Sequence, residues 1–144
     1  MLPAPKQSLD PRLGPIRVLT VDDSPLFRTI LRQAFGGLPG VRLVGTGEDG
    51  LEALKLVEEL RPDLMTLDLE MPRLDGYQTA RALRDCVSCA QVPIIALTAH
   101  AMQEHVQRAL AAGMDDHLAK PLLLDALQHV LLRWGRPRTT ARSA

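Results

Sequence analysis

The chain has 144 residues, with 17 basic and 17 acidic side chains, 46% hydrophobic residues and 3% aromatic residues. A chain of this length and composition forms one soluble globular domain, and its neutral total excludes a strongly basic protein that coats nucleic acid. Counted by segment, the net charge is +2 for residues 1–17, +4 for residues 133–144 and −6 for residues 18–132. The sequence therefore combines an acidic body with basic ends.

The two ends of the chain differ from its body in composition. Residues 1–15 hold four prolines and no apolar periodicity, which predicts a flexible leader, and residues 135–144 predict a basic tail. No apolar run approaches the roughly 18 residues of a membrane span, and the leader lacks the apolar core of a signal peptide. We therefore expect a single domain at residues 16–134 in a cytoplasmic protein without membrane contact.

Strand-like and helix-like segments alternate along the body. Five apolar runs predict strands at residues 16–21, 41–46, 63–68, 92–98 and 116–120. Helical spacing separates them, as in the stripes Leu26, Phe27, Ile30, Leu31, Ala34 and Leu51, Leu54, Val57, Leu60. Ser24 and Pro25 predict a helix start, whereas Gly36 and Gly113 predict helix ends. A last helix is predicted over residues 122–134.

The predicted strands are apolar along their whole length, as in the run IIAL at residues 94–97. Strands of this kind are covered on both faces, and their alternation with helices predicts an α/β fold with a doubly wound parallel sheet. Such sheets place their functional groups at the carboxyl ends of the strands.

Charged and hydroxyl side chains stand at four of these strand ends. Asp22 and Asp23 follow the first strand, Asp68 ends the third, Thr98 ends the fourth and Lys120 ends the fifth. Three carboxylates within about 4–6 Å repel one another by about 4 kcal/mol per pair at an effective dielectric near 20, so the cluster needs a cation. Oxygen ligands completed by water favour Mg²⁺, with Mn²⁺ as an alternative ion. A carboxylate beside such a cation, a lysine and a hydroxyl donor predicts that Asp68 attacks a phosphoryl group.

Four segments carry a resemblance to a known family: VLTVDDSPLFR, DLMTLDLEMPRLDGY, IIALTAHAM and AAGMDDHLAKP. Together they resemble the receiver domain of two-component response regulators, over about residues 16–134. The resemblance implies the flavodoxin-like fold, a five-stranded parallel sheet of order 2-1-3-4-5 with helices on both faces.

The resemblance also implies roles for the acidic residues. Asp68 is then the phosphoacceptor, and Mg²⁺ is held by Asp22, Asp23, Asp68 and the backbone carbonyl of Glu70, one of the first two aspartates acting largely through water. Lys120 pairs with the phosphoryl group.

Further roles follow from the same resemblance. Thr98 moves to hydrogen-bond the phosphoryl group, and Pro121 follows a cis peptide bond. His117 occupies the switch position, where the family commonly has tyrosine or phenylalanine, and its ring is smaller and titratable. The side chains of Glu70 and His100 tune how fast water removes the phosphate.

The implied function is a stand-alone, phosphorylation-activated switch. A histidine kinase or a phosphotransfer protein donates the phosphoryl group to Asp68, and the chain is not an enzyme beyond its own phosphorylation and dephosphorylation. The alternative is a receiver segment of a hybrid histidine kinase or of a larger regulator. The first two segments resemble chemotaxis-type receivers, including those of methylesterases, whereas the last two resemble receivers attached to hybrid kinases. A pseudo-receiver that binds partners without phosphorylation is disfavoured, because every key residue is present.

The last predicted helix has a wide apolar arc, since its polar residues are only Asp125, Gln128, His129 and Arg133. One interpretation is a helix packed partly under the tail. The other is an interaction face, shared by the fourth and fifth helices, for an unknown output partner or a phosphorylation-dependent dimer. The basic ends, without aromatic residues in the tail, do not predict nucleic-acid binding.

Two further motifs suggest competing readings. Gly45, Gly47 and Gly50 spell G-x-G-x-x-G after a strand, so a small dinucleotide-binding domain is a remote alternative. Glu48 and Asp49 argue against it, because they put negative charge where a pyrophosphate would approach.

Cys86 and Cys89 have redox or metal spacing in the connection before the fourth strand. Zinc would need two more ligands, and two cysteines fit a reducing compartment, so the spacing is interpreted as a surface-loop coincidence.

Overall fold

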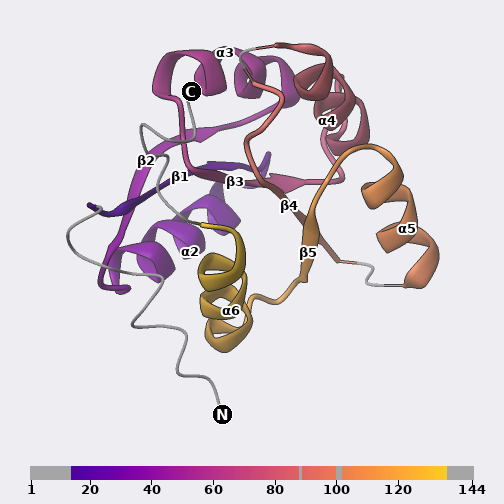
Figure 1. The fold of residues 1–144 in the computed structure, drawn as a ribbon. Coiled ribbons are helices and arrows are strands. Elements are labelled where there is room, and N and C mark those ends of the chain that lie inside the picture. The colour runs from indigo at the N-terminus through magenta and orange to yellow at the C-terminus, as the bar shows by residue number, and fades with distance from the viewer. Residues whose placement is uncertain (1–13, 88, 100–101, 136–144) are drawn as a thin grey trace.

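The computed structural model of the chain describes residues 14–87, 89–99 and 102–135. A five-stranded parallel sheet of order β2-β1-β3-β4-β5 forms its centre (Figure 1). The strands are β1 Ile16–Val21, β2 Val41–Gly47, β3 Leu64–Asp68, β4 Ile94–Thr98 and β5 Asp116–Ala119. The helices are α2 Pro25–Gly36, α3 Gly50–Leu60, α4 Gly76–Asp85, α5 Gln103–Ala111 and α6 Leu124–Trp134. This is the predicted doubly wound fold, with the predicted strand order.

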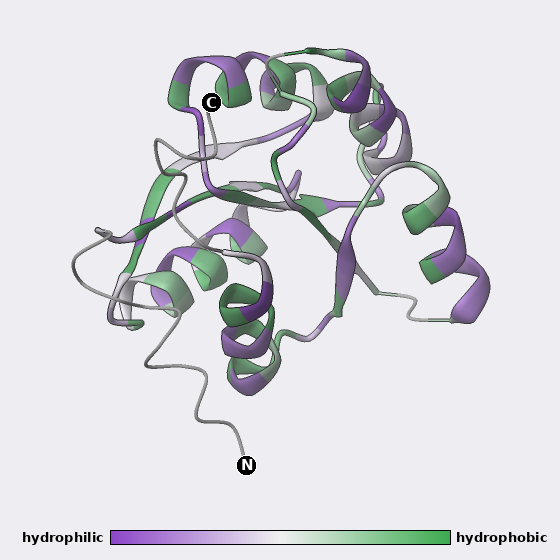
Figure 2. Cartoon of the chain, in the orientation of Figure 1, coloured by the Kyte–Doolittle hydropathy of each residue, from purple (hydrophilic) through white to green (hydrophobic). Residues whose placement is uncertain are grey.

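Two apolar clusters hold the helices to opposite faces of the sheet. One face packs against α3, α4 and α5, through residues such as Val57, Leu83 and Ala109. The other packs against α2 and α6, through residues such as Leu31 and Leu127. Figure 1 shows the two layers, with α3 and α4 above the sheet and α2 and α6 below it. In Figure 2, apolar and polar residues alternate along each helix, as expected when one side of the helix faces the sheet and the other faces solvent.

The helix starts follow from local side-chain chemistry. Ser24 caps α2 by accepting a hydrogen bond from the Phe27 N–H, and Pro25 occupies the first turn, as predicted. Asp75 and Gln78 form a capping box at the start of α4. Each cap fixes where its helix begins after the strand end, and these strand ends carry the site.

Some details differ from the sequence prediction. Gly36 is the last residue of α2 and Gly37 is its cap, one position later than predicted. Leu26, Ile30 and Leu51, which the helical stripes placed toward the core, are 71%, 39% and 58% exposed. The buried face of α2 consists of Phe27, Leu31 and Phe35, spaced four apart, and Leu26 and Ile30 lie one position before it, on the flank of the helix.

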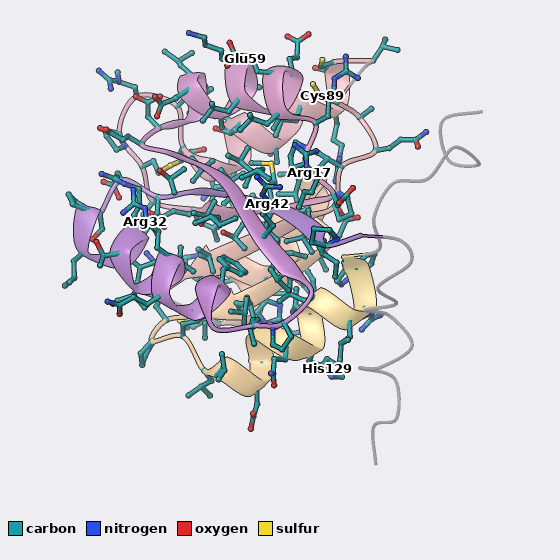
Figure 3. All side chains as sticks on the ribbon, turned by 90° about the vertical axis from the view of Figure 1, so that its left-hand side faces the viewer. Arg17, Arg32, Arg42, Glu59, Cys89 and His129 are labelled. Atoms are coloured by element: carbon teal, nitrogen blue, oxygen red, sulfur yellow. The ribbon has the colours of Figure 1, made fainter. Side chains whose placement is uncertain are left out.

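Strand β2 is an edge strand of the sheet. Its Arg42 is exposed, pairs with Arg17 of β1 and stands on the side of the molecule shown in Figure 3. Charged side chains on an edge strand oppose pairing with another chain. Among the described helices, none combines the length and apolarity needed to cross a membrane.

Candidate functional site

The carboxyl ends of β1 and β3 bring three aspartates together. Asp22 follows β1 and Asp68 ends β3, and these strands pair directly in parallel. One carboxylate oxygen from each of Asp22, Asp23 and Asp68 lies within 4.8 Å of the other two. Asp22 is fully buried, Asp68 is 4% exposed and Asp23 is exposed. The predicted convergence of these carboxylates is therefore observed.

Lys120, which follows β5, reaches this acidic cluster. Its Nζ lies 2.9 Å from Oδ2 of Asp22 and 3.5 Å from Oδ1 of Asp68. The ammonium also lies 4.3 Å from the centroid of the Phe27 ring, in cation–π range. Its backbone N–H donates to the carbonyl of Thr98 at 2.8 Å, and the following bond to Pro121 is cis, as the resemblance implies. The lysine is thus held as the cation between two buried carboxylates.

The two buried carboxylates are also fixed by backbone donors. The Ser24 N–H donates to Oδ1 of Asp22 at 2.9 Å, and the Glu70 N–H donates to Oδ1 of Asp68 at 3.2 Å. Arg28 donates from Nη1 to the backbone carbonyl of Asp22 at 2.7 Å. These contacts orient the acidic groups before any ligand arrives.

Burial, together with the negative charge of Asp22, raises the pKa of the Asp68 carboxyl from 3.8 to about 7, although the Lys120 ammonium acts in the opposite direction. A buried carboxylate next to a second one is costly to ionise, so in this arrangement one lysine does not neutralise the cluster. An added cation would favour the ionised form of Asp68.

The cluster fits a divalent metal ion. Oδ2 of Asp22 is buried and accepts no hydrogen bond within the described part of the chain, and its close polar neighbour is the Lys120 ammonium. The available ligand atoms are carboxylate oxygens, of which those of Asp22 and Asp68 are buried and those of Asp23 face solvent. Mg²⁺ prefers such hard oxygen ligands and keeps several waters when it binds them. Asp22, Asp23 and Asp68 are the residues that could hold it.

The structure describes three of the other predicted site residues, namely Thr98, Glu70 and His117. Thr98 ends β4 and is 3% exposed, and it lines a cavity of about 370 Å³ together with Glu70, which is exposed. His117 lies on β5, and 38% of its side chain is exposed. Its Nδ1 lies 3.7 Å from Oδ1 of Asp116. His100 lies outside the described residues.

Three contributors to the site were not singled out from the sequence. The Phe27 ring lies against the Lys120 ammonium, and Arg28 donates a hydrogen bond to the Asp22 carbonyl. Gly76 allows the start of α4 to approach the end of β3 closely. A Cβ on Gly76 would stand 2.5 Å from the backbone oxygen of Asp68, closer than real contacts allow. For Phe27 and Arg28 the available signal was their position in the first turn of a helix that begins directly after the acidic strand end.

The dinucleotide alternative at residues 45–50 is wrong. The Asp49 carboxylate accepts the Glu52 N–H at 2.9 Å, and the Glu52 side chain accepts the Glu48 N–H at 2.7 Å. The donors that a pyrophosphate would use at this helix start are therefore occupied by the chain's own carboxylates. Gly45 and Gly47 instead serve the close packing of β2, where a Cβ on Gly45 would stand 2.7 Å from Leu60.

The interpretation of Cys86 and Cys89 as a surface-loop coincidence is also incorrect in its geometry. Cys89 is only 3% exposed and belongs to the apolar cluster shared with α4 and β4. The two sulfur atoms lie 2.9 Å apart. The spacing in sequence therefore does bring the thiols together in space.

Fold and site together define a class, namely a doubly wound α/β domain with a buried aspartate, an acidic cluster that could hold a metal ion, and a lysine at the carboxyl edge of its sheet. The chain belongs to the response regulator receiver domain family, whose model matches residues 18–132. It is therefore a receiver domain of two-component signalling.

Known proteins similar to the chain include both larger regulators and isolated receiver domains. A protein-glutamate methylesterase/protein-glutamine glutaminase of Koribacter versatilis is 45% identical over 112 residues, which cover 76% of this chain and 30% of that protein. The receiver domain of the sensor histidine kinase PA1611 from Pseudomonas aeruginosa, solved with magnesium in its active site cleft, is 38% identical with a TM-score of 0.76, covering 84% of this chain and 98% of that one.

A third structure is the co-crystal of the Saccharomyces cerevisiae histidine phosphotransfer protein Ypd1 with the receiver domain of Ssk1. The matched chain is 31% identical with a TM-score of 0.76, and the match covers 85% of this chain and 90% of that one. The chain thus spans about 30% of the length of the curated methylesterase relative and nearly the whole of the solved receiver domains.

Proposed function

We propose that Asp68 accepts a phosphoryl group and that the resulting acyl phosphate switches a surface of this domain. The observation that carries the proposal is the position of Lys120, whose ammonium stands between the buried carboxylates of Asp22 and Asp68. An ammonium at this place can pair with a phosphoryl oxygen brought to Asp68. The pair of buried acids is not needed to cap a helix or to fill the apolar core, so a role in chemistry accounts for it better than a role in folding.

The proposed reaction is an in-line transfer from a phosphohistidine. A carboxylate oxygen of Asp68 attacks phosphorus while the bond from phosphorus to the imidazole nitrogen breaks, and the imidazole keeps that electron pair. The Glu70 N–H and Lys120, both on Oδ1 of Asp68, hold the attacking carboxylate in place. When bound, Mg²⁺ supplies positive charge that offsets the phosphoryl oxygens, and Asp22, Asp23, Asp68 and the Glu70 carbonyl are the proposed ligands.

The switch residues are proposed on placement and chemistry. Thr98 is a buried hydroxyl at the end of β4 and is proposed to hydrogen-bond the phosphorylated Asp68, with Lys120 as its charged partner. His117 on β5 is proposed to change its exposure with that movement, because its side chain is 38% exposed and lies three residues before Lys120 on the same strand end. The side chains of Glu70 and His100 are proposed to set the lifetime of the acyl phosphate.

The donor and the output partner are proposals as well. The likeness to a receiver domain solved in complex with a phosphotransfer protein supports a phosphotransfer protein or histidine kinase as the donor. The exposed apolar side chains of Leu110 on α5 and of Leu123 and Leu124 at the start of α6 support an output face on these two helices, for another protein or for a second copy. A full conversion from 1:99 to 99:1 requires a bias of about 5.5 kcal/mol between the two states.

Two settings for this receiver are compatible with the proposal. The first is a stand-alone cytoplasmic regulator without catalytic activity beyond its own phosphorylation and dephosphorylation. The second is a receiver segment of a larger regulator, such as a methylesterase or a hybrid kinase, and the identity to part of a methylesterase and to the receiver of a sensor kinase favours it. The chemistry at Asp68 is the same in both.

The test is phosphorylation by acetyl phosphate with Mg²⁺, followed by intact mass measurement. The chain should gain the mass of one phosphoryl group, and the gain should require Mg²⁺. Asp68→Asn should abolish it, and Asp23→Asn should reduce it at limiting Mg²⁺. Asp125→Asn is the matched control, because Asp125 is an exposed aspartate on α6 and is not one of the clustered carboxylates. Labelling that survives Asp68→Asn contradicts the proposal.

A further inference from the structure

The connection between α4 and β4 carries a pair of thiols that the proposed phosphorylation does not use. Cys86 caps the C-terminus of α4, and the Cys89 N–H donates to the Cys86 carbonyl at 3.0 Å. The Cys86 and Cys89 sulfurs lie 2.9 Å apart. A disulfide bond is about 2.05 Å long, so closure requires an approach of about 0.9 Å.

The surrounding structure holds the two thiols in this relation. Arg84, on the last turn of α4, donates from Nη1 to the carbonyls of Ala90 at 2.9 Å and of Val92 at 2.7 Å. The same guanidinium reaches Asp115 at 2.8 Å. The segment after Cys89 is therefore tied both to the helix that carries Cys86 and to the segment before β5.

The two thiols differ in accessibility. Cys89 is 3% exposed and packs in the apolar cluster beneath α4, while Cys86 is half-buried at the edge of that cluster. Figure 3 labels Cys89 in the upper layer of the molecule, the layer of α3 and Glu59. A small disulfide can therefore reach Cys86 first, and Cys89 is placed to attack from inside.

Two other functions fit the pair less well. A thiol that acts as a catalyst of disulfide exchange usually lies at a helix N-terminus, where the dipole favours the thiolate, whereas Cys86 lies at a helix C-terminus. A closed zinc site needs four ligands, and within the described ranges the only cluster of three or more metal-ligating side chains is the one formed by Asp22, Asp23 and Asp68.

We propose that Cys86 and Cys89 form a reversible redox couple, closed to an intramolecular disulfide by exchange with a small-molecule disulfide of the glutathione type. The Cys86 sulfur attacks one sulfur of oxidised glutathione, whose disulfide breaks, and one glutathione leaves with the electron pair and takes up the proton lost from Cys86. The Cys89 sulfur then attacks the Cys86 sulfur of the mixed disulfide, and the second glutathione leaves as a thiol. Two protein thiols are oxidised, and one glutathione disulfide is reduced to two thiols.

The experiment uses the full chain, reduced and freed of reductant, in a series of glutathione redox buffers without air. The buffers are quenched with acid, the remaining thiols are trapped with a maleimide, and the intact mass is measured. We expect two maleimide additions in reduced glutathione and none in excess oxidised glutathione, with a monomer mass lower by two hydrogens, no retained glutathione, and recovery of both thiols by dithiothreitol.

Single variants separate the two steps. Cys89→Ser and Cys89→Ala should stop at one retained glutathione on Cys86, and Cys86→Ser should react much more slowly, because its remaining thiol is buried. Circular dichroism on each variant establishes that it is folded, and having both serine and alanine at position 89 covers failure of either one. Wild-type chain that keeps two thiols, retains glutathione or forms a cross-linked dimer in excess oxidised glutathione would overturn the proposal.

Discussion

Replacing Asp68 with asparagine should stabilise the protein when Mg²⁺ is absent. The site then keeps the Glu70 N–H contact to a side-chain oxygen of similar shape but loses a buried charge next to Asp22. The interval between the ordinary pKa of 3.8 and about 7 corresponds to about 4 kcal/mol at 1.36 kcal/mol for each pH unit. Solvent near the exposed Asp23 screens the repulsion between Asp22 and Asp68. We therefore expect Asp68→Asn to raise the free energy of unfolding by about 2 kcal/mol at pH 7.5.

The stability difference between Asp68→Asn and wild type should depend on pH. The folded wild-type protein retains the Asp68 proton up to about pH 7, whereas the unfolded chain loses it near pH 4, so the folded state binds more protons between these values. The stability that this proton contributes is fully present below about pH 4 and is lost as the pH rises to about 7. Asp68→Asn lacks that loss, so the two proteins should differ little at pH 4 and most at pH 7.5.

The assay is urea unfolding in EDTA at pH 4, 5.5 and 7.5, followed by circular dichroism, for wild type, Asp68→Asn and the exposed control Asp125→Asn. At pH 7.5, Asp68→Asn should raise the free energy of unfolding by about 2 kcal/mol, whereas the control should change it by less than about 0.5 kcal/mol. The reasoning is refuted if Asp68→Asn is no more stable than wild type at pH 7.5, or if its advantage is as large at pH 4.

Three further predictions concern the residues that build the site. Gly76→Ala should lower the free energy of unfolding by about 2 to 4 kcal/mol in urea titrations, because the added Cβ would meet the Asp68 backbone. Gly36→Ala, where the added Cβ meets open space, should raise it by up to about 1 kcal/mol. Equal effects of the two substitutions would contradict the close approach at Gly76. Lys120→Met should lower the free energy of unfolding by about 2 kcal/mol at pH 7.5, because it leaves two buried carboxylates without their cation. Mg²⁺ should restore part of the lost stability in thermal melts. An unchanged stability of Lys120→Met would contradict the pairing. Ser24→Ala should cost about 1 kcal/mol through the lost cap, and Ser24→Asp, which keeps a capping oxygen, should cost clearly less by the same titration.

The sequence predicts the fold well because its strands are short, apolar and separated by one helix each. All five predicted strands occur in the structure, with end shifts of no more than two residues, such as β4, which begins at Ile94 rather than at residue 92. Pro93 lies before it and cannot donate to a ladder, which is a physical reason for the later start. The last helix also begins two residues later than predicted, at Leu124 rather than at residue 122.

The site is predicted only in part, since strand ends fix the backbone position of a residue but not the packing around it. Asp22, Asp68 and Lys120 follow from their places at the ends of parallel strands. The contact of Lys120 with the Phe27 ring depends on how far α2 lies from β5, which no local pattern encodes. The spacing of Cys86 and Cys89 is visible in the sequence, but its interpretation as a surface-loop coincidence is wrong, because the burial of Cys89 depends on packing between α4 and β4.

Chemical mapping of the phosphorylated residue tests the central claim most directly. The chain is treated with acetyl phosphate and Mg²⁺, reduced with borohydride, which converts an aspartyl phosphate to homoserine, and digested for tandem mass spectrometry. The account predicts homoserine at position 68, in the peptide that contains Leu67 and Glu70, and unmodified aspartate at positions 22 and 23. Homoserine at another aspartate, or an unmodified Asp68 in a chain that has gained a phosphoryl group, would contradict it.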